Sequence, residues 1–102
     1  MIFYGVRFID GEWTKVTRGM NFEQTLSWIG TTYHSGEIKK RTLWGVYTFN
    51  REDAKDMAVF LGGGLQPQED INQSGCYPHF HTSNRRFGYN KGFHIWYGLK
   101  NP

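Results

Sequence analysis

Aromatic rings, more than leucine or valine, have to form the core of this chain. They make up 18% of its 102 residues, while all hydrophobic residues together make up 38%. A chain of this length can build one compact core but is too short for two ordinary domains. Large rings bury much apolar surface per residue, so they can offset the chain entropy that is lost on folding. We therefore expect a single domain over residues 1–102 in which many rings are structural.

Charge, cysteine content and the length of apolar runs limit the cellular location and the kinds of partner that we expect for the chain. The net charge of +3 is mild and suits an anionic partner without requiring one. The single cysteine, Cys76, cannot form an internal disulfide, which favours a reducing, cytoplasmic location. No apolar run approaches the roughly 18 residues that cross a bilayer, and residues 1–7 do not resemble a signal peptide. We therefore expect no membrane anchor and no membrane partner.

Two segments in the first half of the chain predict strands. Residues 2–9 are rich in β formers and stop at Asp10-Gly11, which is a strong hairpin turn signal. A second strand over residues 13–17 would complete the hairpin. A further strand is expected over residues 42–49, where aromatic and β-branched side chains again dominate.

Two helices are expected, each with an asparagine at its start. Asn21 is expected to cap a short helix over residues 22–29, which Gly30 would end. Asn50 is expected to cap a longer helix that reaches Leu61, with acidic residues in its first turn and a run of three glycines at its end. The apolar stripe of this second helix should pack on the sheet.

Two polar segments are predicted to be connections. Residues 31–41 include Lys39-Lys40-Arg41, which we interpret as part of a solvated loop rather than as a phosphate-facing patch. Residues 65–75 show no periodicity and are also expected to lack regular structure.

The last third of the chain predicts a second hairpin, which carries three of the four histidines. Residues 77–83 and 93–97 have the composition of strands, and the basic, turn-forming stretch 84–92 separates them. Because side chains alternate between faces along a strand, His79 and His81 must point the same way. In the register that we expect, one face is apolar and the other holds the histidines and a tryptophan. The cross-strand pairs of that register are Phe80 with Ile95, His79 with Trp96, and His81 with His94.

The face that carries the histidines predicts acid–base chemistry on RNA. Imidazole has an unperturbed pKa of about 6.5, which suits proton transfer near neutral pH. His79 or His81, paired with His94, would serve as base and acid of a metal-independent ribonuclease that needs no cofactor. The residues expected to bind substrate are Arg85, Arg86 and Lys91, which would hold phosphate, and Tyr77 and Trp96, which would stack on bases.

Three alternatives to this enzyme stay open. A non-catalytic module would use the basic, aromatic hairpin to bind nucleic acid, a nucleotide or a protein. The histidines could instead be hydrogen-bonded members of an aromatic sheet. They could also ligate zinc or copper, but neither histidine strand contains the acidic residue that commonly supports such ligands. We therefore expect no bound transition metal.

A short motif adds a family resemblance. Residues 77–81 read Tyr-Pro-His-Phe-His and residues 94–98 read His-Ile-Trp-Tyr-Gly, after a helical segment at 53–58. This pattern resembles C-terminal toxin domains of bacterial polymorphic proteins of the RHS or YD-repeat type, over about residues 50–98. The resemblance implies a small nuclease effector with the three histidines at its site and an inhibitor (immunity) protein as its partner.

Taken as a whole, the pattern predicts an α+β fold. One or two helices should pack on a largely antiparallel sheet that contains the last two strands. RNA is the expected substrate.

Overall fold

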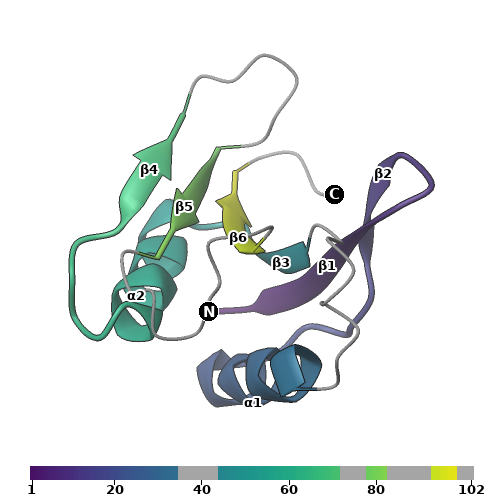
Figure 1. Ribbon diagram of the computed structural model, residues 1–102, viewed down its shortest axis with the longest axis horizontal. Coiled ribbons are helices and arrows are strands. Elements are labelled where there is room, and N and C mark those ends of the chain that lie inside the picture. The colour runs from purple at the N-terminus through teal and green to yellow at the C-terminus, as the bar shows by residue number, and fades with distance from the viewer. Residues whose placement is uncertain (35–43, 72–77, 83–92, 99–102) are drawn as a thin grey trace.

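The structure is a computed structural model that describes residues 1–34, 44–71, 78–82 and 93–98. Within these residues, two helices and a six-stranded sheet confirm the predicted α+β class (Figure 1). In chain order the elements are β1 (Phe3–Ile9), β2 (Glu12–Lys15), α1 (Phe22–His34), β3 (Trp44–Thr48), α2 (Arg51–Leu61), β4 (Gln68–Asp70), β5 (His79–His81) and β6 (Phe93–Tyr97).

The sheet is largely antiparallel, as predicted. Its strands are ordered β2-β1-β3-β6-β5-β4. Neighbouring strands run antiparallel except β3 and β6, which run parallel. The chain leaves β3 through α2 and reaches β6 only after β4 and β5, so the N-terminal and C-terminal parts of the chain meet along this central parallel pair.

The predicted hairpin of β1 and β2 is confirmed. Asp10 and Gly11 have positive φ angles of 50° and 82°, as a two-residue type I′ turn requires. β2 ends at Lys15, earlier than expected, but residues 16 and 17 continue to hydrogen-bond to β1. The Val16 N–H donates to the Gly5 carbonyl oxygen at 2.8 Å, and the Gly5 N–H donates to the Thr17 hydroxyl oxygen at 2.8 Å. A side chain therefore replaces the backbone acceptor at the end of the pairing.

Both helices begin at the predicted asparagines. At α1, the Gln24 N–H donates to Asn21 Oδ1 at 2.8 Å and the Asn21 N–H donates to Gln24 Oε1 at 2.9 Å, which is a reciprocal capping box. At α2, Asn50 Oδ1 accepts from the backbone N–H groups of Glu52 and Asp53. Neither helix of the described chain is long and apolar enough to cross a membrane.

The prediction that Gly30 ends the first helix is wrong. α1 continues to His34, because Ile29 and Thr32 lie three residues apart on one helix face and are both buried. Burial of this face offsets the roughly 1 kcal/mol that glycine costs inside a helix. The predicted loop over residues 31–41 therefore begins as helix, and its basic run lies outside the described residues.

The prediction that residues 65–75 lack regular structure is wrong in part. Gln68 to Asp70 form β4, which pairs antiparallel with β5 and ends the sheet on that side. Two of its three residues, glutamate and aspartate, are depleted in strands, so local composition gives no sign of this strand. Its position depends on contacts made elsewhere in the fold, above all by Glu69.

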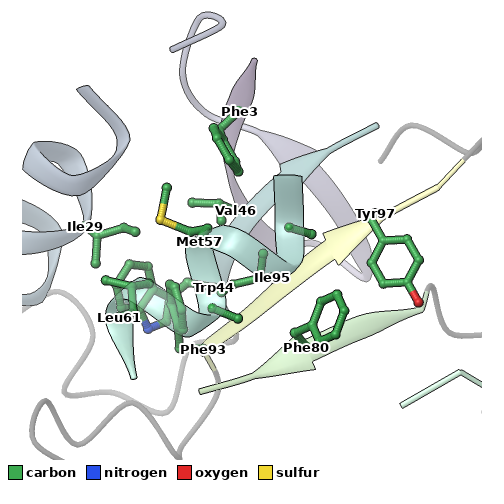
Figure 2. Packing of buried hydrophobic residues seen from close by; sticks show 12 residues of the cluster. Phe3, Ile29, Trp44, Val46, Met57, Leu61, Phe80, Phe93, Ile95 and Tyr97 are labelled. Carbon is green, nitrogen blue, oxygen red and sulfur yellow. The ribbon is translucent and has the colours of Figure 1, made fainter. Parts of the chain in front are cut away.

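One face of the sheet and both helices enclose the main core (Figure 2). Aromatic rings supply much of it, as the composition predicts, and Trp44 packs edge-on against Phe93 with ring centroids 4.7 Å apart. The buried members of this core are Phe3, Ile29, Trp44, Val46, Ala54, Met57, Ala58, Leu61, Phe80, Phe93, Ile95 and Tyr97.

The other face of the sheet carries a smaller apolar cluster. Val6, Tyr47 and Trp96 are buried there, with Tyr4 and Trp13 packed against them. These residues alternate along their strands with residues of the main core, and no residue of α1 or α2 belongs to the cluster. This face, away from the two helices, is the one that bears the histidines.

Candidate functional site

The C-terminal strands pair in the predicted register. His79 lies across from Trp96 and Phe80 across from Ile95 in the antiparallel pair of β5 and β6. Phe80 and Ile95 consequently enter the main core, which the helices cover. The alternation of side chains then turns His79, His81 and the neighbouring part of β6 toward the opposite face. The segregation expected from spacing alone is confirmed.

The structure brings the three predicted histidines together. The ring centroids of His79 and His81 are 4.8 Å apart, and each ring lies 4.6 Å from that of His94. One ring nitrogen from each residue lies within 4.8 Å of the other two. His79 Nε2 and His81 Nε2 are separated by 3.1 Å, which is a hydrogen-bond distance. The imidazoles therefore converge on one point rather than occupying separate positions in the sheet.

An aspartate joins the histidines, against the expectation that no acidic residue lies near them. Asp70 Oδ2 is 3.1 Å from His81 Nε2 and 3.4 Å from His79 Nε2. Asp70 lies across from His79 in the pairing of β4 with β5. Asp70 could not be assigned to the site from the sequence, because β4 has no recognisable strand composition and lies outside the two histidine strands.

The site is half open to solvent. The side chain of His79 is 7% exposed, while those of His81 and Asp70 are 30% and 29% exposed. Burial lowers the pKa of His81 below its ordinary value, and the neighbouring His79 lowers it further, whereas Asp70 acts in the opposite direction. The lowered pKa favours a neutral His81 imidazole, which is the form that can bind a metal or accept a proton.

Tryptophan rings form one wall of the site. The ring of Trp96 stacks on that of His94 with centroids 4.8 Å apart and an interplanar angle of 26°. Trp96 also contacts Trp13, with ring centroids 4.2 Å apart. Trp96 is only 4% exposed, so its ring supports His94 from within the smaller cluster. The other residues predicted to bind substrate, Tyr77, Arg85, Arg86 and Lys91, lie outside the described residues.

Comparison of the chain with protein-family models, with curated proteins and with solved structures finds no match. The resemblance to polymorphic toxin domains, and the inhibitor protein that it implies as a partner, therefore stay predictions.

Proposed function

We propose that this chain binds a divalent transition metal ion, with zinc as the best fit, through His79, His81, His94 and Asp70. The observation that carries the proposal is a triangle of donor atoms. His79 Nε2, His81 Nε2 and Asp70 Oδ2 are separated by 3.1, 3.1 and 3.4 Å. Bonds of about 2.0–2.2 Å to a tetrahedral zinc ion place its ligand atoms about 3.3–3.6 Å apart. The triangle is slightly smaller than one face of such a tetrahedron, and its two 3.1 Å edges are hydrogen-bond contacts.

His94 supplies a candidate for the fourth ligand. Its ring nitrogen belongs to the group of histidine nitrogens that lie within 4.8 Å of one another, which exceeds the edge of a zinc tetrahedron, so the His94 ring would have to shift toward the triangle to bind the ion. Imidazole and carboxylate together suit zinc, and also copper, iron and nickel, among which four-coordinate tetrahedral geometry favours zinc. The earlier expectation of a metal-free site rested on the lack of an acidic partner, and Asp70 removes that reason.

The alternative without a metal needs an acid and a base that flank a phosphate. Each of the two groups would reach its substrate atom over about 2.6–3.2 Å, from opposite sides of the reacting phosphate. In the structure, one nitrogen of each histidine ring lies within 4.8 Å of the other two. Such close grouping of donor atoms is what a metal ion requires.

The test of metal binding is a calorimetric titration of chelator-treated protein with Zn²⁺. We expect one ion per chain for the wild type, and binding that is weakened by Asp70→Asn and abolished by His79→Ala. Asp56→Asn is the matched control, because Asp56 is an exposed carboxylate of α2 and its loss should leave the affinity unchanged. No stoichiometric binding by folded wild type, or equal affinity in the His79→Ala variant, would refute the proposal.

RNA cleavage is our second proposal for this site. It is supported by His81 and His94, which are only partly buried and so stay within reach of a ligand. Such a reaction would need one coordination position free for water, so only three of the four candidate ligands would hold the ion, and the ion would supply an activated water as nucleophile. We expect cleavage of a fluorescent RNA to stop in chelator and to return with Zn²⁺. Cleavage that survives chelator but is lost in His94→Ala would instead favour the metal-independent mechanism predicted from the sequence.

A further inference from the structure

The residues of β4, the strand that carries Asp70, contribute little to holding that strand in place. β4 has three polar residues, all at least partly exposed, and it stands at the end of the strand order beside β5. A strand this short at the edge of a sheet gains little from pairing or burial of its own. Some other contact must fix its position if Asp70 is to stay 3.1 Å from His81 Nε2.

Glu69 makes that contact on the opposite side of the strand. Arg51 Nε donates to Glu69 Oε2 at 2.7 Å and Arg51 Nη2 donates to Glu69 Oε1 at 2.8 Å, which is a two-point interaction. The Tyr97 hydroxyl also donates to Glu69 Oε2. The Arg51 guanidinium is the main cause that holds the pKa of Glu69 below its ordinary value.

The two partners of Glu69 belong to rigid parts of the fold. Arg51 is the first residue of α2, next to its Asn50 cap, and Tyr97 is the last residue of β6. Tyr97 is a buried member of the main core, beside Phe80 (Figure 2). Glu69 thus connects an edge strand to a capped helix and to the central region of the sheet.

Consecutive residues of a strand point to opposite faces. Glu69 lies across from Phe80, and Asp70 lies across from His79. When the Glu69 carboxylate is held on the helix-covered side, the backbone of β4 is fixed and Asp70 is turned toward the histidines. A one-residue slip of β4 would exchange the two carboxylates and remove Asp70 from the site.

We infer that Arg51, Glu69 and Tyr97 form a clamp that positions Asp70 as a ligand and thereby sets the affinity and coordination geometry of the metal centre. This inference rests on the proposed metal binding. The three residues lie on the side of the sheet away from the ion, so they are positioning residues and not ligands. Supporting residues around a metal site commonly change affinity by about 10–100-fold.

The test compares Tyr97→Phe and Glu69→Gln with wild type in two measurements. Tyr97→Phe is the cleaner variant, because it removes only the hydroxyl and keeps the buried ring. We expect the affinity for Zn²⁺ to fall about tenfold or more in both variants. The visible absorption spectrum of the Co²⁺-loaded protein, which reports coordination geometry, should shift toward that of Asp70→Asn. Glu52→Gln is the control, because Glu52 is the other carboxylate that Arg51 pairs with, at 2.8 Å, and its loss should change neither measurement.

A double-variant comparison separates positioning from general stability. If the clamp acts through Asp70, then adding Tyr97→Phe to Asp70→Asn should cause no further loss of affinity. The inference is overturned if Tyr97→Phe and Glu69→Gln bind Zn²⁺ like wild type while Asp70→Asn does not. It is also overturned if Tyr97→Phe weakens binding equally with and without Asp70. Failure of the wild type itself to bind Zn²⁺ would instead refute the proposed function, and the clamp with it.

Discussion

At the scale of single residues, the site depends on a glycine as well as on its ligands. Gly45 of β3 lies across from His94 in the parallel pair of β3 and β6. A Cβ at this position would overlap the backbone oxygen of His94 and would come within 2.7 Å of the Trp96 ring. Spacing along the strands identified the histidines, but the need for glycine at position 45 could not be predicted from the sequence. It arises because β3 and β6 are neighbours in the sheet although they are distant in the chain.

Gly45→Ala should therefore destabilise the protein. Overpacking of a well-packed site costs about 1–3 kcal/mol, and here the overlap involves backbone that cannot rotate away. We expect a lower free energy of unfolding in urea, measured in chelator, together with weaker Zn²⁺ binding because His94 is displaced. Stability and affinity equal to those of wild type would show that β6 can move without cost.

At the scale of elements, the sequence predicted those whose signals are local. The Asp10-Gly11 turn and the Asn21 and Asn50 caps each fix backbone conformation through neighbouring residues. The two wrong predictions, the end of α1 and the absence of a strand in residues 65–75, concern segments whose structure depends on tertiary contacts. Burial on one side of α1 carries the helix past Gly30, and β4 exists through its pairing with β5 and the contacts of Glu69.

Gly30→Ala should stabilise the protein, in contrast to Gly45→Ala. A Cβ at Gly30 would meet nothing within 4 Å, and the residue lies inside α1. Alanine has a higher helix propensity than glycine and reduces the entropy of the unfolded chain, so we expect a gain of about 0.5–1 kcal/mol. Thermal unfolding of the two variants beside wild type checks this difference. A loss of stability in Gly30→Ala would mean that α1 does not continue through this position.

At the scale of the whole molecule, the α+β class and the division of the β5–β6 pair into an apolar face and a histidine face were predictable, because both follow from periodicity. The order of the strands was not, since no local signal shows that β3 and β6 run side by side in parallel. The three histidines could be placed together because they lie on one predicted hairpin. Asp70 could not, because no local signal shows that β4 pairs with β5. The complete site needs three strands, β4, β5 and β6, that are separated in the chain.

Because the ligands come from three strands, metal binding should stabilise the entire fold. An ion that binds only the folded state adds about 2.7 kcal/mol at a free concentration of 100 times its Kd. We expect the thermal unfolding midpoint of wild type to rise with Zn²⁺ and to return to its starting value in chelator. The His79→Ala variant should show no such rise. A Zn²⁺-dependent rise of equal size in that variant would place the ion elsewhere.

The most direct test of the central claim is a crystal structure of the Zn²⁺-loaded protein with anomalous data collected at the zinc absorption edge. The account predicts one strong anomalous peak bonded to His79 Nε2, His81 Nε2 and Asp70 Oδ2 at about 2.0–2.2 Å, with His94 completing the site. The absence of a peak at this cluster, or a peak bonded only to residues elsewhere in the chain, would contradict it.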